Sequence, residues 1–311
     1  MSGIGIVLNP HSRANRKDPG RARRFGFIVG DKGSCYETQT LADVERLAKE
    51  FRDRGIEILG ISGGDGTLHK TLSVFVKVYG DRPLPRIAFL RGGTMNNVAT
   101  TLGIHGTSDE ILSRLILKYH RGDDFPTTQV PLLRVNHEYG FLFGLGMPTR
   151  FLQTYGRYGE ESQTPYRAAA LVAGYTLSAL MNGKAAARMC RRFDAHLTVD
   201  GEVLPFKNYI LIFGGTIECA CFNFRPLYRT RQFEGRFQIL GLSCTPRHLA
   251  LMIPQILMAK PIASDCMLDR VGSSVVIECS EPLRYMIDGD ISEEVQRIEL
   301  GLGPKLECVI P

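Results

Sequence analysis

The 311-residue chain has no long hydrophobic run. Its longest uncharged apolar stretch, residues 168–181, is shorter than the roughly 20 residues that a helix needs to span a bilayer. We therefore do not expect a transmembrane protein. The sequence also contains no internal repeat and no low-complexity linker.

Metal-binding cysteine spacing is absent as well. The eight cysteines are scattered, without a C-x-x-C pair and without a histidine–cysteine cluster of zinc spacing. No secretory signal precedes the first apolar run, so we expect reduced thiols in a cytosolic protein. Nucleic-acid-binding modules and interleaved basic and aromatic residues are also missing, so we expect no nucleic-acid partner.

The remaining composition is that of an ordinary globular protein, with 44% apolar and 23% charged residues. The length favours two domains. The net charge is +6, and the basic residues form two clusters, Arg13, Arg16, Lys17, Arg21, Arg23 and Arg24, and Arg150, Arg157, Arg167, Lys184, Arg188, Arg191 and Arg192. Such clusters either are simply solvated or attract an anionic nucleotide or an anionic lipid surface.

The first part of the chain alternates short apolar runs with helical patterning. Strands are expected at residues 5–9, 56–61 and 87–90, and helices over residues 41–54, through Leu72 and Phe75, and from Asn97. This order predicts β-α-β units with a parallel sheet. Ligands of such sheets gather at the carboxyl ends of the strands.

After about Gln129 the pattern changes to short β-rich segments separated by turns, which predicts a largely antiparallel sandwich. Helical insertions are expected at residues 166–188 and 248–258. We expect an α/β domain over residues 1–128 and a β-sandwich domain over residues 129–311. The final run, residues 295–310, could pair with either domain.

Two glycine turns carry the strongest chemical signal, Gly63-Gly64-Asp65-Gly66-Thr67 and Gly92-Gly93-Thr94-Met95-Asn96. Each lies between a predicted strand and a predicted helix, where backbone N–H groups and the positive helix end converge on an anion. Glycine allows the close approach that a phosphate needs. We expect a nucleotide whose phosphates are held mainly by backbone, with a plain tight turn as the alternative.

Asp65 is unusual beside a phosphate because like charges repel, so we expect it to bind a metal or to orient a hydroxyl. The overlapping residues 60–64 match G-x-S-x-G, the nucleophile elbow of serine hydrolases, with Ser62 as nucleophile. The later His196 and His248 lie in no convincing loop context. A hydrolase also leaves the second glycine turn unexplained, so we favour the nucleotide site.

Two further places offer polar groups at strand ends. Asp288-Gly289-Asp290 follows an apolar run and puts two carboxylates around a glycine. Such a pair can accept a proton from an attacking hydroxyl or help to hold a cation, although Asp-Gly alone indicates a hairpin turn. Asn9 ends the first strand, where its amide either faces a nucleotide or belongs to a terminating turn.

Together these residues resemble the diacylglycerol kinase catalytic-domain superfamily, which includes bacterial lipid kinases, sphingosine kinases and ceramide kinases. The resemblance runs through most of the chain, from Asn9-Pro10 and Thr38 through the two glycine turns and Gly144-Leu145-Gly146 to Asp288-Gly289-Asp290. It implies an N-terminal domain similar to those of phosphofructokinase and NAD kinase, a β-sandwich domain, and ATP in the cleft between them.

The resemblance also implies roles for single residues. Asp290 stands at the closing acid of the family's D-G-E triplet, the base toward the lipid hydroxyl, and Asp288 holds the first acid position. Magnesium and backbone dipoles then stabilise the transferring phosphoryl group. The implied ATP contacts are Asn9, Thr38, Gly63, Gly64, Asp65, Gly66, Thr67, Gly92, Gly93 and Thr94, with Asn96 supporting the second turn.

Three departures from the family pattern matter. Asn97 stands where many relatives have aspartate, Met147-Pro148 replaces a Phe-Asp pair, and Glu234-Gly235 replaces an Asp-Gly that contributes to a structural magnesium site in some bacterial members. Glu234 is thus the candidate ligand of a second metal. Asp290 is also one methylene shorter than the family's glutamate.

Three functions stay open on this sequence. The first is a cytoplasmic, ATP- and Mg²⁺-dependent kinase that docks on an anionic membrane and phosphorylates a diacylglycerol, ceramide or sphingoid lipid. The second is a kinase with a soluble acceptor such as NAD, because NAD kinases share the Gly-Gly-Asp-Gly turn. The third is a catalytically inactive lipid-binding or regulatory protein. A homodimer is compatible with each of them.

Overall fold

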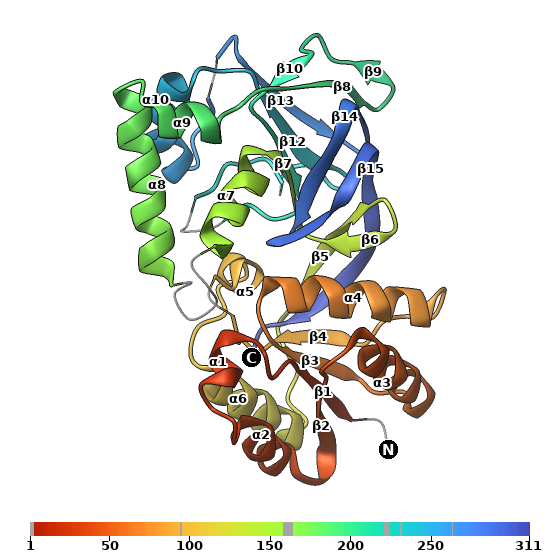
Figure 1. Cartoon of the computed structure of the whole chain (residues 1–311). Helices are drawn as coiled ribbons and strands as arrows, with labels where there is room; N and C mark the ends of the chain where they lie inside the picture. Colours follow the sequence, from red (N-terminus) through yellow and green to blue (C-terminus); the bar gives the residue numbers. More distant parts are fainter. Residues whose placement is uncertain (1–2, 94, 158–163, 221–223, 231, 263) are drawn as a thin grey trace. The chain divides into compact units, whose positions relative to one another are not determined.

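The computed structural model describes residues 3–93, 95–157, 164–220, 224–230, 232–262 and 264–311 (Figure 1). The chain divides into two compact units, one formed by Met1–Pro131 with Pro304–Pro311 and the other by Leu132–Gly303. It passes from one unit to the other within β5 (Thr127–Val135) and again within β15 (Asp290–Val309). The final run of the sequence therefore contributes to both units.

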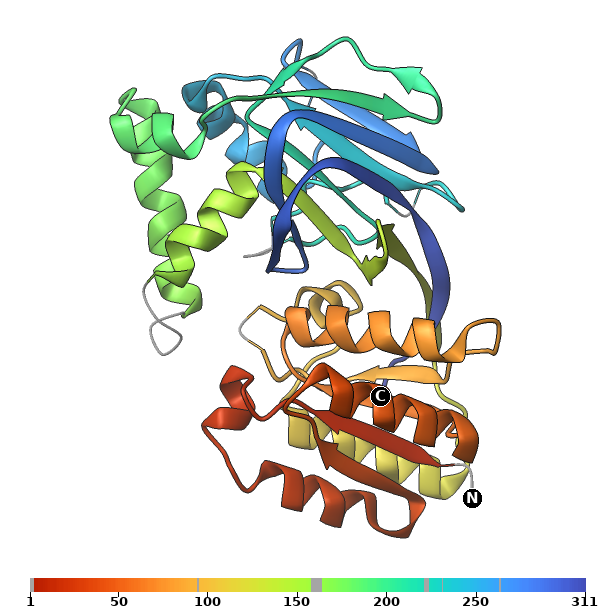
Figure 2. The ribbon, with the colours of Figure 1, turned by 45° about the vertical axis from the view of Figure 1, so that its right-hand side comes forward.

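The first unit is a parallel sheet flanked by helices (Figure 2). Its strands follow the order β15 end, β4 (Arg86–Phe89), β3 (Ile58–Ser62), β1 (Ile4–Leu8) and β2 (Gly33–Glu37), and each neighbouring pair is parallel. Every residue of β1 and β3 is buried, as expected for central strands covered on both faces. The α/β part of the expected fold is confirmed.

The helices of this unit begin and end at clear sequence signals. In α3, the Thr40 side chain accepts from the N–H of Asp43 and the Asp43 carboxylate accepts from the N–H of Thr40, and left-handed Gly55 ends the helix. A similar box and Gly122 bound α6. The helices are α1 (Arg13–Arg16), α2 (Arg21–Val29), α3 (Leu41–Arg54), α4 (Asp65–Tyr79), α5 (Asn97–Thr101) and α6 (Ser108–Arg121), with a 3₁₀ turn at Gly30–Lys32.

The second unit consists of antiparallel strands around one apolar core, which confirms the other part of the expected fold class. One path of paired strands runs β13, β12, β11, β7, β14 and β15, while β8 pairs with β14, β9 and β10, and β5 pairs with β6. The strands are β6 (Glu138–Gly140), β7 (Leu142–Gly146), β8 (Phe193–Val199), β9 (Glu202–Val203), β10 (Asn208–Tyr209), β11 (Leu211–Gly215), β12 (Phe237–Leu242), β13 (Met267–Gly272) and β14 (Ser274–Ile287).

The long strand β14 connects two parts of this unit. Its first half pairs with β8, its second half pairs with β7, and an irregularity between Glu278 and Leu283 lies between the two halves. A bulge of this kind bends a strand and re-aims its side chains. The carboxyl end of β14 consequently lies beside β7, where the hairpin to β15 begins.

The helices of the second unit depart from the expectation in one respect. The single helix expected over residues 166–188 is two helices, α8 (Pro165–Leu180) and α9 (Lys184–Met189), because Asn182 has a left-handed φ of 52° and Gly183 caps α9. The sequence analysis missed α7 (Met147–Gly156), whereas α10 (Pro246–Leu257) covers the second expected insertion. No helix in the described part of the chain is long and apolar enough to cross a membrane.

The cysteine expectation is also wrong for one pair. Cys244 and Cys266 form a disulfide although 22 positions separate them. They meet because β12 pairs with β13 in a register that sets Leu242 opposite Met267, and the Ser243 N–H donates to the Cys266 carbonyl (2.8 Å). The sequence spacing gives no sign of this contact, since it depends on the strand register.

Candidate active site

The two glycine turns lie against each other in the first unit, at the carboxyl ends of β3 and β4. The Gly92 N–H donates to the Gly63 carbonyl at 2.9 Å. A Cβ atom on Gly93 would lie 2.3 Å from the Cα of Gly64, and one on Gly92 would lie 2.8 Å from the nitrogen of Gly63. Real Cβ atoms do not approach so closely, so these glycines are needed for the packing of one turn on the other.

The first turn leads directly into α4. Gly64 is the N-cap, so the N–H groups of Asp65, Gly66 and Thr67 lie in the first helical turn, which has no intrahelical partners for its donors. These groups and the helix dipole give this end of α4 a positive character. The turn is thus suited to an anion such as a phosphate.

Asp65 joins the two turns. Its two carboxylate oxygens accept the N–H of Asn97 at 3.0 and 3.2 Å, which fixes the first residue of α5 to the first residue of α4. Burial raises the pKa of Asp65 to about 6, although hydrogen bonds from the main chain of Asn97, Val98 and Asn96 act in the opposite direction. The structure therefore gives this carboxylate a positioning task. Its expected role toward a metal or a hydroxyl stays a prediction.

The second turn is closed by its own asparagine. The Gly93 N–H donates to Asn96 Oδ1 and Asn96 Nδ2 donates to the Gly93 carbonyl, both at 3.0 Å. Asn96 has a left-handed φ of 50°, which asparagine tolerates better than most residues. The expected contact residue Thr94 lies outside the described residues.

The other expected contact residues lie at the ends of neighbouring strands. Asn9 follows β1 and donates from Nδ2 to Thr67 Oγ1 at 2.8 Å, and the Thr67 hydroxyl keeps its own hydrogen to donate. Thr38 follows β2, is buried, and donates its N–H to the Leu8 carbonyl at 2.9 Å. The structure thus brings Asn9, Thr38 and the described residues of both turns to one edge of the sheet.

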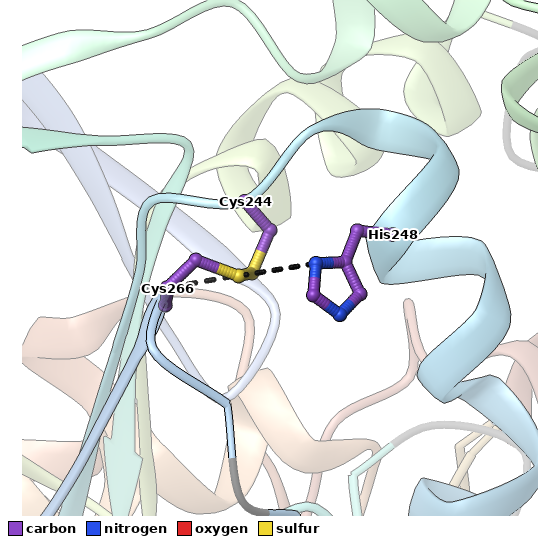
Figure 3. A group of neighbouring side chains, drawn as sticks. All are labelled: Cys244, His248 and Cys266. Atoms are coloured by element: carbon purple, nitrogen blue, oxygen red, sulfur yellow. Dashed lines mark hydrogen bonds between the residues drawn. A yellow bond between two sulfur atoms is a disulfide. The ribbon is translucent and has the colours of Figure 1, made fainter.

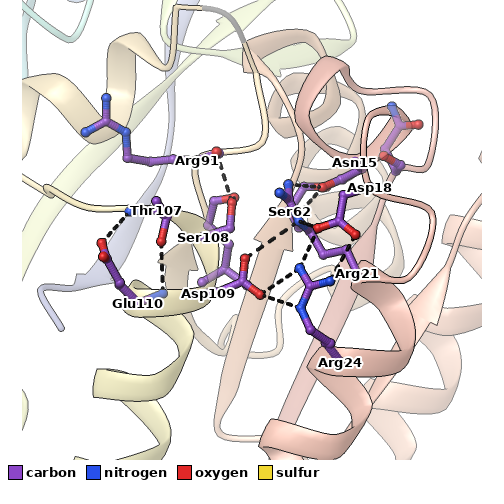
Figure 4. A network of polar contacts seen from close by, with 12 residues as sticks. Asn15, Asp18, Arg21, Arg24, Ser62, Arg91, Thr107, Ser108, Asp109 and Glu110 are labelled. Atoms are coloured by element: carbon purple, nitrogen blue, oxygen red, sulfur yellow. Dashed lines mark hydrogen bonds and ion pairs between the residues drawn. The ribbon is translucent and has the colours of Figure 1, made fainter.

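Asn15 is a site residue that the sequence analysis missed. It is buried, and its Nδ2 donates to the carbonyls of Asn9 (2.8 Å) and Ser62 (3.1 Å), which fixes the ends of β1 and β3 together. The Ser62 hydroxyl donates to Asn15 Oδ1 at 3.3 Å (Figure 4). Ser62 has no solvent exposure, so it lacks the accessible hydroxyl that a nucleophile elbow presents.

Part of the first basic cluster supports this frame (Figure 4). Arg21 donates to Asn15 Oδ1 at 2.9 Å, and Arg24 donates to both Asp18 and Asp109. The hydrogen bond from Arg24 lowers the pKa of Asp18. The pKa of Arg24 is raised, because the carboxylates of Asp18 and Asp109 stabilise the charged guanidinium. These two arginines therefore hold α2 to α1 and α6. Acids of the protein itself neutralise part of the positive charge that was expected to attract an anion.

The acidic triplet lies in the second unit. Asp288 and Gly289 form the two-residue turn between β14 and β15, with φ values of 47° and 93° that fit a type I′ hairpin. The buried Asp288 carboxylate accepts the N–H groups of Phe141 (3.0 Å) and Leu142 (2.8 Å). Asp290 is partly buried and begins β15. Asp288 is thus a main-chain clamp beside Asp290.

Glu234 lies exposed in the loop before β12. Asp269, in the same region, is partly buried and accepts from the Tyr228 hydroxyl and from Gln238 Nε2, both at 2.8 Å. Within the described ranges, the group of three side chains close enough to hold an ion consists of Cys244, His248 and Cys266. Glu234 belongs to no such group there, so its expected role as a metal ligand stays a prediction without structural support.

Sequence comparison relates these turns to a known domain. The family model described as "Diacylglycerol kinase catalytic domain" matches residues 4–125. The chain is 28% identical over 140 residues to "Probable lipid kinase YegS" of Salmonella arizonae, which covers 44% of this chain and 43% of that protein. It is 26% identical over 114 residues to the protein of the same name in Shigella flexneri, and this match covers 36% of each of the two chains. The match thus spans less than half the length of these relatives.

Structural comparison extends over the whole chain. Three solved structures from Bacillus anthracis str. Sterne, described as a diacylglycerol kinase or a putative one, superpose with TM-scores of 0.67, 0.74 and 0.70. They cover 100% of this chain and 97% of their own, at 14–16% sequence identity. At that identity the likeness shows the fold. The family match assigns residues 4–125, most of the first unit, to the diacylglycerol kinase catalytic domain.

Proposed function

We propose that the protein is an ATP-dependent lipid kinase that transfers the γ-phosphate of ATP to a lipid hydroxyl of diacylglycerol, ceramide or sphingoid type. The observation that carries the proposal is the pair of glycine turns joined main chain to main chain at the carboxyl edge of a parallel sheet. Several backbone donors at one helix end suit a polyphosphate better than a single small anion. The printed name of the YegS relatives supports a lipid acceptor.

The residues at this edge fit ATP as follows. The first-turn N–H groups of α4 and the Thr67 hydroxyl are donors for phosphate oxygens. The one acidic side chain of the two turns, Asp65, is held by the N–H of Asn97. We therefore infer that the phosphates of ATP, and not Asp65, would hold Mg²⁺, which would neutralise phosphate charge and stabilise the transferring phosphoryl group. Asp65 then acts by keeping the two turns together.

We assign proton removal from the lipid hydroxyl to Asp290. A carboxylate can accept this proton as the oxygen attacks, which typically contributes a factor of about 10²–10⁴. Asp288 is the positioning residue, because its two oxygens already accept the N–H groups of Phe141 and Leu142. By fixing the hairpin turn, Asp288 fixes the main chain from which the Asp290 side chain projects.

The proposed acceptor requires contact with a membrane, and the helices α8, α9 and α10 offer a suitable surface. They pack together through the small buried side chains Ala179, Ala186 and Ala250. Large apolar side chains remain exposed on α8 and α10 and in the residues that follow them, among them Tyr166 at 88% and Met181 at 74%, together with Leu177, Leu180, Leu251, Leu257 and Met258. We call these residues the apolar docking surface.

The segments that carry this surface have charged side chains of one sign. Residues 164–193 and 243–264 contain no Asp or Glu, although the chain has 32 of them. The same residues include seven cations, Arg167, Lys184, Arg188, Arg191, Arg192, Arg247 and Lys260. Exposed apolar side chains with a cationic surround are the features that bind helices to an anionic lipid surface. We propose that the apolar docking surface binds there.

One assay tests the proposal. Purified protein receives labelled ATP, Mg²⁺ and, in separate reactions, vesicles of anionic phospholipid with diacylglycerol, ceramide or sphingosine, or NAD without vesicles. Label in one of the lipids is the expected result. Label in NAD alone would move the assignment to a kinase with a soluble acceptor. Vesicle binding without label in any acceptor would replace the kinase with an inactive lipid-binding protein.

A further inference from the structure

The disulfide between Cys244 and Cys266 lies beside an imidazole ring (Figure 3). Cys244 precedes the N-cap of α10, His248 lies in the first turn of that helix, and Cys266 precedes β13. His248 Nδ1 is 3.4 Å from Cys266 Sγ, and Ser264 Oγ is 3.2 Å from the same sulfur. The site therefore combines two disulfide-bonded sulfurs with a base and a hydroxyl.

We propose that Cys244 and Cys266 form a reversible dithiol–disulfide couple, which a hydroperoxide oxidises and an external dithiol reduces, with Cys266 as the thiol that reacts first. The site lies outside the residues assigned to nucleotide binding and to proton removal. It is a redox site in its own right, and its chemistry does not depend on the proposed kinase activity.

The surroundings of the two sulfurs distinguish their roles. Cys244 is 2% exposed, whereas Cys266 is partly exposed and can be reached by a small oxidant. In the tautomer that carries its hydrogen on Nε2, His248 offers Nδ1 as the acceptor of the Cys266 proton. The Ser264 hydroxyl can donate to the resulting thiolate. Cys266 thus has the access and the base that a reactive thiol needs.

The reaction balances with one hydroperoxide per disulfide. The Cys266 thiolate attacks the outer oxygen of the hydroperoxide, an S–O bond forms, the O–O bond breaks, and the alcohol or water that leaves takes up the proton held by His248. Cys244 then attacks the sulfenic sulfur, the S–S bond forms, and water leaves with the Cys244 proton. An external dithiol reverses the change by thiol–disulfide exchange and is itself oxidised to a disulfide.

Other cysteines of the chain contrast with this pair. Burial raises the pKa of the Cys35 and Cys308 thiols to about 12 and that of Cys279 to about 11. Burial also raises the pKa of Cys190. A thiol reacts with peroxide as its thiolate, so these four cysteines should remain unreactive at neutral pH. Selective oxidation is therefore expected at the pair that has a histidine beside it.

Reversal does not require the protein to unfold. The Ser243 N–H to Cys266 carbonyl bond and the pairing of β12 with β13 hold the two ends of residues 244–266 together without the disulfide. This segment carries α10, which packs with α8. The disulfide closes it into a loop, so oxidation should reduce the freedom of α10. If the proposed membrane function holds, the disulfide also restricts the movement of the part of the apolar docking surface that α10 carries.

Thiol counting on the full-length protein tests the chemistry. We reduce the protein with dithiothreitol, remove the reductant, add hydrogen peroxide, alkylate with iodoacetamide and measure the alkylated peptides by mass spectrometry. Alkylation of Cys244 and Cys266 should fall together and return with fresh dithiothreitol. Resistance of the disulfide to dithiothreitol in the folded protein would overturn reversibility. If stoichiometric Zn²⁺, added to the reduced protein, blocked oxidation, the pair would be a metal site and the redox assignment would be wrong.

Variants separate the two thiols. In Cys244→Ser, oxidation should stop at a sulfenic acid on Cys266 that dimedone labels, whereas Cys266→Ser should give no label on Cys244. His248→Asn keeps an acceptor but removes the base, and should slow oxidation about 10²-fold. Cys190→Ser is the control and should behave as the wild type. Equal labelling of either remaining thiol, or an unchanged rate in His248→Asn, would contradict the assigned roles.

Hydrogen exchange tests the structural consequence without any kinase assay. The amides of α10 should exchange faster in the reduced protein than in the oxidised one, while those of α6 in the first unit should not change. Equal exchange of α10 in both states would overturn the link between the couple and the helix. These readouts do not use ATP or lipid, so their failure is distinguishable from failure of the proposed kinase.

Discussion

Asp65 in the first unit and Asp288 in the second serve the same structural end in different surroundings. Each carboxylate accepts main-chain N–H groups from a segment far along the chain, Asp65 from Asn97 and Asp288 from Phe141 and Leu142. Asp65 lies at the start of a helix, and Asp288 lies in a left-handed hairpin turn. Each acid lies next to a glycine, in a sequence that first suggests a metal ligand or a base.

The two carboxylates differ in which groups they position for the reaction. Asp65 holds together two turns whose available groups are mainly backbone N–H donors, whereas Asp288 holds a hairpin that continues into the side chain of Asp290. The first site should therefore respond mainly to changes of backbone geometry. The second should depend on one carboxylate.

The largest effect is expected for Asp290→Asn. Removal of the base should lower the rate of phosphoryl transfer about 10³-fold while ATP affinity and the free energy of unfolding stay near wild type. Steady-state rates with the lipid acceptor, together with ATP titration, measure both quantities. Exposed Glu293→Gln, three residues along the same strand, is the matched control. A wild-type rate in Asp290→Asn would remove the residue from the mechanism.

Asp288→Ala should lower the free energy of unfolding by about 3 kcal/mol, because two buried N–H groups lose an ionised acceptor. Asp288→Asn should cost about 1 kcal/mol, since asparagine tolerates the left-handed turn and still accepts one hydrogen bond. Urea unfolding measures both. If the two variants lost transfer activity at unchanged stability, Asp288 would be part of the chemistry and the clamp interpretation would be wrong.

Asp65 predicts a pH dependence of stability. Its pKa is raised to about 6 in the fold from an ordinary value of 3.8, so the folded state keeps its proton where the unfolded state has lost it. The contribution of Asp65 is fully present below pH 4 and is lost as the pH rises to 6, by at most about 3 kcal/mol, and then stays constant.

The measurement is the difference in unfolding free energy between wild type and Asp65→Asn from pH 4 to 7. That difference should fall across pH 4–6 and then level off, because other titrating groups cancel in the comparison. Asp81→Asn, which removes an exposed acid of the same unit, is the control for the loss of one carboxylate. A flat curve for Asp65→Asn would mean that burial does not raise the pKa of its carboxylate in the folded protein.

Gly93→Ala tests the backbone contact between the turns. The new Cβ would meet the Cα of Gly64, so we expect about 2 kcal/mol of destabilisation and at least tenfold weaker ATP binding. Gly26→Ala is the control, since Gly26 lies inside α2 with no atom within 4 Å of the new Cβ, and should stabilise by about 0.5 kcal/mol. Unchanged ATP affinity in Gly93→Ala would separate the turn contact from the nucleotide site.

Local signals explain why the first unit could be predicted from the sequence. Buried apolar runs gave β1, β3 and β4, the helical spacing of apolar residues gave α3, and glycine turns after β3 and β4 gave the position of the site. The second unit was predictable as antiparallel strands for the same reason. Each of these features depends on residues that are neighbours in the chain, and they establish the fold class.

Three of the features that the sequence analysis missed depend on contacts between distant segments. Asn15 lies in a basic stretch whose sequence gives no hint that its amide bonds to Asn9 and Ser62. The Cys244–Cys266 disulfide follows from the register of β12 and β13. The packing of Gly92 and Gly93 on Gly63 and Gly64 is also a contact between distant segments. From the sequence we had expected these glycines to make room for a phosphate. Which apolar side chains of α8 and α10 are exposed could also be seen only in the structure.

The smallest expected effect concerns that surface. Leu251→Asp, on α10, puts a negative charge at a 62% exposed apolar position and should weaken binding to vesicles of anionic phospholipid about tenfold. Leu117→Asp makes the same change at a 51% exposed leucine on α6 of the first unit and should leave binding unchanged. Vesicle sedimentation measures both, and sedimentation velocity shows whether either variant changes the oligomeric state.

The paired variants decide between a membrane and a second copy of the chain as the partner of this surface. Weaker vesicle binding by Leu251→Asp alone, with an unchanged sedimentation coefficient, supports the membrane. A change in oligomeric state by Leu251→Asp without an effect on vesicles would instead make α10 part of a homodimer interface. Equal loss of vesicle binding in both variants would mean that the protein's charge as a whole governs binding, and that the acid-free helices have no special part in it.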